Sequence, residues 1–152
     1  MSKGIQGKVV LITGGGTGLG AETARHLASK GALVAVAGRR KGKLDEVVGQ
    51  IAEAGGRAGA YQLDVARKDQ VKAVVDEVIA DFGKLDVLIN NAGLMPIRPM
   101  AEVNTEEWDA MIDINVKGVL YGIAAALPIF LSQESGHFIN LSSVAGVKVF
   151  AP

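Results

Sequence analysis

The sequence predicts an α/β protein built on a doubly wound parallel sheet, and three observations support this fold class. Short continuous apolar runs alternate with longer segments in which apolar residues recur every three or four positions. The short runs are typical of strands buried on both faces, and the longer segments of amphipathic helices. Glycines close several of these segments, and no linker or charge run interrupts the alternation. We therefore expect one domain over residues 1–152, with right-handed crossovers.

Each element is predicted from its own pattern. A strand and a helix follow one another four times, and a fifth strand ends the series. Gly31 and Gly83 are expected to end two of the helices, and Asn104 to cap a third, with Glu107 three residues later. In chain order, the expected elements are strand 9–12, helix 18–30, strand 33–37, a helix carrying residues 44–51, strand 58–63, helix 71–82, strand 87–89, a long helix 105–131 and strand 138–141.

Composition narrows the function classes. The chain is 49% hydrophobic and only 21% charged, which is enough apolar side chain for a core and too little charge for disorder. Sixteen basic residues balance sixteen acidic ones, so nothing favours nucleic acid or an anionic membrane as a partner. With no cysteine and no metal-spaced histidines, we expect no metal site. The first residues lack a signal-peptide pattern and no apolar stretch has the length of a membrane span, so we expect a cytoplasmic protein.

A glycine-rich turn joins the first expected strand to the first expected helix. This position suits a phosphate group, because glycines let the backbone approach it and the helix N-terminus offers free N–H groups. A tight turn without a ligand is the alternative, and no Gly-Lys-Ser/Thr follows that would indicate a P-loop. The candidate cofactor-binding residues here are Gly14, Gly16, Thr17, Gly18, Leu19 and Gly20.

The motifs along the chain resemble those of the short-chain dehydrogenase/reductase family. The glycine turn fits the pattern T-G-x-x-x-G-x-G, which begins at Thr13. Asp64-Val65 follows the third strand, Asn90-Asn91-Ala92-Gly93 the fourth, and Ser142-Ser143-Val144-Ala145-Gly146 the fifth, while Asn115 lies in the long helix. The resemblance covers the whole chain. It implies a Rossmann-like sheet in the order 3-2-1-4-5, incomplete at its C-terminal end, and an NAD(P)-dependent oxidoreductase.

The resemblance also implies roles for the residues after the third and fourth strands. Asp64 would touch the adenine, with Val65 packed beside it. Asn91, Ala92 and Gly93 would border the nucleotide near its ribose. Read without the resemblance, Asp64 is a surface carboxylate and the asparagine pair is a turn.

Two residues are expected at the reaction centre. Ser143, the second of the serine pair, would hydrogen-bond the substrate oxygen and stabilise the charge that develops on it. Asn115 falls within an apolar helical stripe, so its side chain needs hydrogen-bond partners. The resemblance implies a kinked helix there and a water held for a proton relay; a structural asparagine between helices is the alternative. The stripe consists of Trp108, Met111, Ile112, Val119, Leu120 and Ile123, and we interpret Trp108 and the methionines as core or pocket wall.

Arg39 and Arg40 follow the second strand, where enzymes that prefer NAD usually carry an acid for the ribose 2′-hydroxyl. Arginine can instead bind a 2′-phosphate through charge-assisted hydrogen bonds. We therefore predict NADP as the cofactor, with NAD less favoured. Two solvated arginines that open a helix are the alternative.

The family's acid–base pair, a Tyr and a Lys four residues apart, does not occur after Ser143 in this sequence. We expect it beyond Pro152, and expect the 152 residues alone to be inactive. Tyr61 and Tyr121 belong to other elements and cannot replace it. The complete protein is expected to act on a small alcohol or carbonyl compound and to form a homo-oligomer. A non-catalytic nucleotide-binding module is the alternative, and a Tyr-x-x-x-Lys downstream would exclude it.

Overall fold

Five parallel strands form one sheet in the computed structural model, which describes residues 4–148. Their order, β3-β2-β1-β4-β5, and the parallel pairing of every neighbour confirm the predicted doubly wound sheet. The expected boundaries hold to within a residue or two, except that the third helix begins at Lys68, three residues before its expected start. The strands are β1 (Val9–Thr13), β2 (Leu33–Gly38), β3 (Arg57–Gln62), β4 (Val87–Asn90) and β5 (His137–Asn140).

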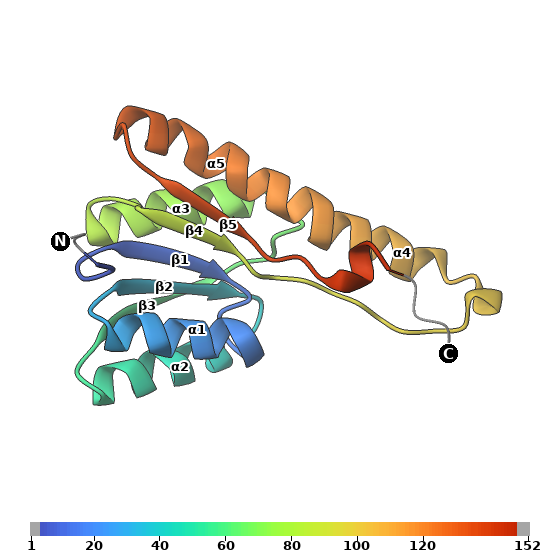
Figure 1. The fold of residues 1–152 in the computed structure, drawn as a ribbon, viewed down its shortest axis with the longest axis horizontal. Coiled ribbons are helices and arrows are strands. Elements are labelled where there is room, and N and C mark those ends of the chain that lie inside the picture. Colours follow the sequence, from blue (N-terminus) through green and yellow to red (C-terminus); the bar gives the residue numbers. More distant parts are fainter. Residues whose placement is uncertain (1–3, 149–152) are drawn as a thin grey trace.

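Helices cover both faces of this sheet, as Figure 1 shows. One face carries α1 (Gly18–Ser29) and α2 (Lys41–Glu53); the other carries α3 (Lys68–Phe82) and α5 (Gly118–Ser132). The short helix α4 (Thr105–Met111) continues through a π-helical segment (Ile112–Lys117) into α5. Short 3₁₀ turns at Met100–Glu102 and Val144–Gly146 complete the described elements.

Strand alternation divides the core into two layers. Val10 and Ile12 point to the side of α1 and α2, while Val9 and Leu11 point to the side of α3 and α5. All four are at most 1% exposed, which explains why β1 reads as a continuous apolar run rather than as an alternating one. The central position of β1 therefore follows from its sequence.

The long helix differs from its prediction in which face it buries. Its buried residues are small, apart from Phe130, because α5 lies close to the sheet and to α3. Trp108, Ile112 and Leu120 of the predicted stripe are 37%, 52% and 57% exposed. Trp108 and the methionines were expected to be core or pocket wall; the core half of this expectation is wrong for Trp108, and also for Met95 and Met100, which are 61% and 77% exposed. Buried residues of α5 are Gly118, Gly122, Ala125, Ala126 and Phe130.

A π-helical segment also interrupts the predicted stripe. One extra residue in the helical repeat rotates the following side chains by about 100°, so a stripe with constant period cannot continue through it. The helix is π-helical around Asn115, over Ile112–Lys117, which is where the kink was expected. The expected cap is also present, because Asn104 accepts a hydrogen bond from the backbone N–H of Glu107 at 3.1 Å.

The same helical stretch, Thr105–Ser132, is long and apolar enough to cross a membrane by length and composition alone. The sequence-based expectation that no stretch reaches this length is therefore corrected. Apolar helices that pack on a sheet pass the same test, and α5 packs against α3 and the sheet here.

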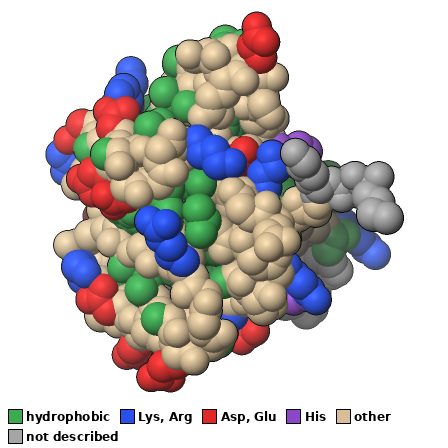
Figure 2. Space-filling view, turned by 90° about the vertical axis from the view of Figure 1, so that its left-hand side faces the viewer, with side chains coloured by type: hydrophobic (Ala, Val, Ile, Leu, Met, Phe, Trp, Pro, Cys, Tyr) green, Lys and Arg blue, Asp and Glu red, His purple; other side chains and the backbone are tan. Residues whose placement is uncertain are grey.

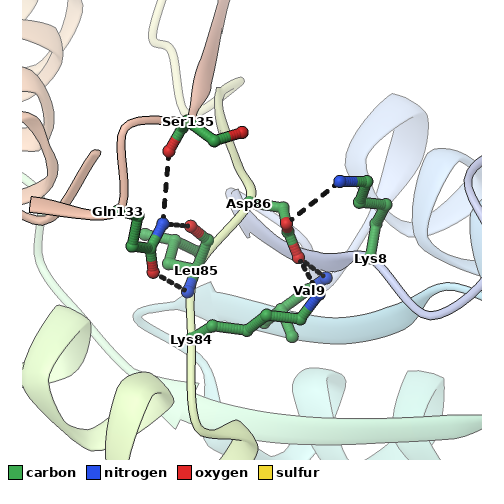
Figure 3. Close-up of polar contacts among 7 residues, drawn as sticks. All are labelled: Lys8, Val9, Lys84, Leu85, Asp86, Gln133 and Ser135. Atoms are coloured by element: carbon green, nitrogen blue, oxygen red, sulfur yellow. Dashed lines mark hydrogen bonds and ion pairs between the residues drawn. The ribbon is translucent and has the colours of Figure 1, made fainter. Parts of the chain in front are cut away.

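A partly buried carboxylate joins β1 to β4 at the amino ends of the strands (Figure 3). Asp86 accepts hydrogen bonds from the backbone N–H of Val9 at 2.8 Å and from Lys8 Nζ at 3.2 Å, and it pairs with Lys84 Nζ at 2.8 Å. Its side chain is only 11% exposed. Figure 2 views this end of the molecule, where side chains of both charges are interspersed with hydrophobic ones. Asp86 thus fixes the register of the two central strands.

Its ionisation is shifted accordingly. Burial by itself raises the pKa of Asp86, but the hydrogen bonds from Lys84, Val9 and Lys8 together outweigh burial and lower the pKa below its ordinary value. A carboxyl group with a lowered pKa stabilises the fold above its unfolded-state pKa, and this stabilisation is lost as the pH falls through the folded-state pKa.

We predict that Asp86→Asn lowers the free energy of unfolding by about 1–2 kcal/mol at neutral pH, because it removes the charge that two lysines and a backbone amide share. Asp76→Asn is the matched control: its carboxylate pairs with Lys72 on the exposed surface of α3 and should matter by about 0.5 kcal/mol at most. Urea unfolding at pH 7, 5 and 3 measures both. The Asp86→Asn deficit should shrink at the lowest pH, and a deficit independent of pH would contradict the assignment.

Candidate functional site

A cleft of about 330 Å³ opens beyond the carboxyl ends of the strands. It lies where the strand order reverses between β1 and β4, the place at which open α/β sheets bind ligands. Twelve of the thirteen residues predicted to bind cofactor line it; Gly18 does not. The twelve are Gly14, Gly16, Thr17, Leu19, Gly20, Arg39, Arg40, Asp64, Val65, Asn91, Ala92 and Gly93.

The glycine turn is shaped so that only glycine fits at its key positions. Gly14 has a φ of +67°, a conformation that side chains disfavour. A Cβ on Gly20 would lie 2.3 Å from the carbonyl oxygen of Gly14 and 2.6 Å from Nδ2 of Asn91. The first turn of α1 therefore presses directly on the strand-to-helix turn, and its backbone forms one wall of the cleft.

The N-terminus of α1 suits an anion. Thr17 occupies the N-cap position with an extended backbone, but its side chain caps no N–H group of the helix. Its hydroxyl instead accepts a hydrogen bond from Arg40 at 3.2 Å. The first turn also holds no acidic residue, so the positive end of the helix dipole faces the cleft without a side-chain counter-charge.

Thr13 and Asn91 tie this turn to β4. Thr13 Oγ1 accepts hydrogen bonds from the backbone N–H groups of Asn91 and Ala92, each at 3.1 Å. Asn91 Nδ2 donates to the carbonyl oxygens of Thr13 and Gly14 at 2.9 and 3.3 Å. The Asn-Asn-Ala-Gly sequence is therefore more than a turn, because its second asparagine holds the glycine turn in place.

Two arginines stand at the end of β2, where no carboxylate is present. Gly38 ends the strand, and Arg39 and Arg40 follow with exposed side chains that line the cleft. Arg40 is fixed towards the glycine turn by Thr17, whereas the carbonyl oxygen of Arg39 accepts a hydrogen bond from Gln62 at 3.1 Å. The cleft is thus basic at this corner.

Asp64 and Val65 line the cleft after the end of β3. Asp64 Oδ1 accepts a hydrogen bond from the backbone N–H of Ala66 at 3.0 Å, which orders the turn into α3. Val65 packs against the start of α5, where a Cβ on Gly118 would lie only 2.9 Å from Val65 Cγ2. Both side chains are partly buried and line the cleft.

Asn115 meets the loop that follows β4. Its Oδ1 accepts from the backbone N–H of Leu94 at 2.8 Å, and its Nδ2 donates to the carbonyl oxygen of Leu94 at 2.7 Å. The side chain has the hydrogen-bond partners expected for it, and its exposure argues against a structural asparagine buried between helices. Its partners come from the chain directly after Gly93, and it links the π-helical segment to that loop.

Ser143 lies after β5, beyond the residues that line the cleft. Its hydroxyl oxygen accepts a hydrogen bond from the backbone N–H of Ala145 at 3.2 Å and caps the short 3₁₀ turn. The side chain is exposed, and this bond uses an oxygen lone pair, so the hydroxyl proton can be donated elsewhere.

Six cleft residues were missed by the sequence reasoning. Most of them are apolar residues or glycine. At their places near the ends of strands and the beginnings of helices, the sequence pattern predicts only a core or a turn residue. Lys43 carries a different signal, a cation in the first turn of α2, which the helix dipole disfavours. The six are Gly38, Lys43, Leu44, Leu63, Leu94 and Ile114.

Neither tyrosine lies in the cleft. Tyr61 is 6% exposed and donates a hydrogen bond to Asp81 at 2.6 Å; burial, followed by this hydrogen bond, raises its pKa. Tyr121 packs against the core between the sheet and α3. Over residues 4–148, no group of histidine and acidic side chains is placed to hold a metal ion.

Comparison with known proteins identifies relatives of similar sequence. A family model described as short chain dehydrogenase matches residues 8–151. An uncharacterized oxidoreductase of Listeria innocua is 46% identical over 146 residues, which cover 96% of this chain and 59% of the relative. One from Staphylococcus saprophyticus is 44% identical, covering 96% of this chain and 58% of the relative. The chain thus spans about three fifths of the length of these curated relatives.

Solved structures share the fold. A metagenomic short-chain oxidoreductase in complex with NADP matches with a TM-score of 0.89 and 37% identity, covering 97% of this chain and 67% of that one. An NAD⁺-bound xylitol dehydrogenase matches with a TM-score of 0.91 and 34% identity, covering 96% of this chain and 56% of that one.

We predict that Gly20→Ala destabilises the fold by about 1–3 kcal/mol and weakens nucleotide binding, because its Cβ would collide with the backbone of Gly14. Gly49→Ala is the control: nothing lies within 4 Å of its Cβ position in α2, and it should stabilise by about 0.5–1 kcal/mol. Thermal unfolding and nucleotide titration measure the pair. Unchanged nucleotide affinity in Gly20→Ala would show that the turn does not hold the nucleotide.

Proposed function

Because the chain belongs to the short-chain dehydrogenase family, we propose that it is the cofactor-binding part of an NADP-dependent oxidoreductase. The substrate we propose is a small alcohol or its carbonyl counterpart. One observation carries this proposal: the glycine turn, the N-terminus of α1 and two arginines line one cleft that no carboxylate at the end of β2 closes off. When bound, the nicotinamide accepts or donates the hydride.

The residues present fit a dinucleotide. The close contact of Gly20 with Gly14 leaves backbone rather than side chain facing the cleft, which lets a pyrophosphate come near the free N–H groups of α1. Asp64 and Val65 would flank the adenine, and Asn91, Ala92 and Gly93 would border the ribose. Gly18 would contribute through its backbone conformation, with a φ of +54°, rather than through a contact.

Cofactor preference would rest on Arg39 and Arg40. A guanidinium group pairs a phosphate through two hydrogen bonds, whereas it offers the 2′-hydroxyl of NAD little. The relatives do not decide the matter, because one similar structure is a complex with NADP and another is NAD⁺-bound. In this chain, β2 ends at Gly38 and not at an acidic residue, and this supports NADP as the cofactor.

Ser143 would donate a hydrogen bond from its hydroxyl group to the substrate oxygen. Such a donor stabilises negative charge as it develops on that oxygen. The hydrogen bond from Ala145 orients the hydroxyl oxygen and leaves its proton free for this purpose.

Asn115 would serve the proton relay as a positioning residue. One acceptor and one donor of its amide are engaged by Leu94, so the side chain holds the loop after Gly93 against the π-helical segment. A water bound at the distorted helix would thereby keep a fixed place relative to the cleft.

We predict that Arg39→Asp lowers the preference for NADP over NAD by about ten- to hundredfold, since it replaces a phosphate partner with a repelling charge. Steady-state kcat/KM with each cofactor, in the full-length protein, measures this. Lys41→Asp makes the same charge change outside the cleft and should alter the ratio far less. Equal efficiency with both cofactors before mutation would contradict the NADP assignment.

We predict that Ser143→Ala in the full-length protein lowers kcat by about a hundredfold or more, with little change in cofactor affinity. Ser142→Ala, one residue earlier, should be far milder. The measurements are kcat for carbonyl reduction and Kd for NADPH. A larger loss in Ser142→Ala would place the catalytic hydroxyl one residue earlier.

A further inference from the structure

The first turn of α2 carries an arrangement of charge that helix stability alone does not favour. Arg40 is its N-cap, Lys41 and Lys43 follow, and the first turn holds no acidic residue. Cations next to the positive end of a helix dipole are unfavourable by about 0.3–1 kcal/mol each. A local rule broken in this way is expected at a functional site.

The two lysines of this turn are not equivalent. Lys43 lines the cleft together with Arg39 and Arg40, whereas Lys41 does not. The Lys43 Cβ lies 3.3 Å from the position that a Cβ on Gly16 would take, so its stem packs beside the glycine turn. The next residue, Leu44, is only 1% exposed and anchors this part of the helix.

Lys43 is held by a weak partner. Its Nζ lies 2.8 and 3.0 Å from the two carboxylate oxygens of Glu46, one turn further along α2. The two side chains are 46% and 58% exposed. Exposed ion pairs at this spacing stabilise a helix by only a few tenths of a kcal/mol, so the lysine can change partner at little cost.

We infer that Lys43 is a third cation for the 2′-phosphate of NADP and that Glu46 is its competing partner in the absence of nucleotide. This inference rests on the proposed NADP preference and extends it. A phosphate dianion carries more charge than a carboxylate and also complements the positive end of α2. Arg40, bound to Thr17, and the anchored stem of Lys43 would then hold the phosphate between the glycine turn and α2.

Glu46 has the opposite effect in this scheme. Its carboxylate lies beside the position of the 2′-phosphate and competes with that phosphate for Lys43. Glu46 therefore weakens the binding of NADP and leaves the binding of NAD unchanged. Lys41 and Asp45 form the comparable pair outside the cleft, with Nζ 2.7 Å from Oδ1. Their pairing provides a matched control on the same helix.

The test uses the full-length protein and isothermal titration with NADP and NAD, then with 2′,5′-ADP and 5′-AMP. Lys43→Gln should weaken binding of the two 2′-phosphorylated ligands by about three- to tenfold and leave the other two unchanged. Glu46→Gln should strengthen 2′-phosphate binding by about two- to threefold. Lys41→Gln and Asp45→Asn are the controls. They should change the ratio of NADP to NAD affinity, and that of 2′,5′-ADP to 5′-AMP affinity, by no more than about twofold.

The outcomes separate this inference from the proposed function. If the unmodified protein prefers NADP and Arg39→Asp removes that preference, but Lys43→Gln does not change it, the role of Lys43 is refuted and NADP preference stands. If the unmodified protein binds NAD as well as NADP, the proposed cofactor preference itself fails. An equal loss of NAD and NADP binding in Lys43→Gln would identify a structural effect and overturn the inference.

Discussion

The hydrogen-bonded junction between Thr13 and Asn91 is the constraint on which the cleft depends. It joins the end of β1 to the residue after β4 through side-chain and backbone contacts in both directions. Residues 78 positions apart are thereby held within hydrogen-bond distance, at the point where the strand order reverses. The glycine requirement at position 20 follows from the same junction, because Asn91 Nδ2 and the carbonyl oxygen of Gly14 occupy the space that a side chain would need. A substitution at any of these positions would disturb the others.

The polar junction continues along the carboxyl edge of the sheet. Asn90 is only 4% exposed, and its Nδ2 donates to Asn140 Oδ1 at 2.8 Å, joining β4 to β5. A Cβ on Gly122 would lie 2.5 Å from Asn90 Oδ1, so α5 must present a glycine there. A buried amide needs partners, and Asn140 of β5 supplies one to Asn90 of β4, while Gly122 of α5 leaves room for the Asn90 side chain. The edge that faces the cleft is therefore held by side chains, and the amino edge by the carboxylate of Asp86.

The sequence predicts the sheet and the cleft well because both depend on local signals. Apolar runs of strand length, closing glycines and polar residues directly after strands are visible in the chain, and parallel strands bring those polar residues to one edge. The long helix shows where this reasoning stops. Its buried face is made mainly of glycine and alanine, which carry almost no hydrophobic signal, while larger residues such as Leu120 face outwards. Close packing on a sheet selects small residues, so a pattern of large apolar residues indicates the wrong face.

Partners outside the helix are the second limit, as Glu107 illustrates. Its spacing from Asn104 predicts a reciprocal cap, and Asn104 does accept from the N–H of Glu107. The carboxylate, however, accepts from Arg98 Nε at 2.8 and 2.9 Å instead of turning back to the cap. Arg98 lies in the loop after β4, which Asn115 holds at its other end through Leu94. A charged partner nine residues away competes for a side chain that local pattern assigns to the helix end. The loop bordering the cleft is thus fixed at two points by contacts with α4 and the π-helical segment, and the sequence of the loop alone specifies neither.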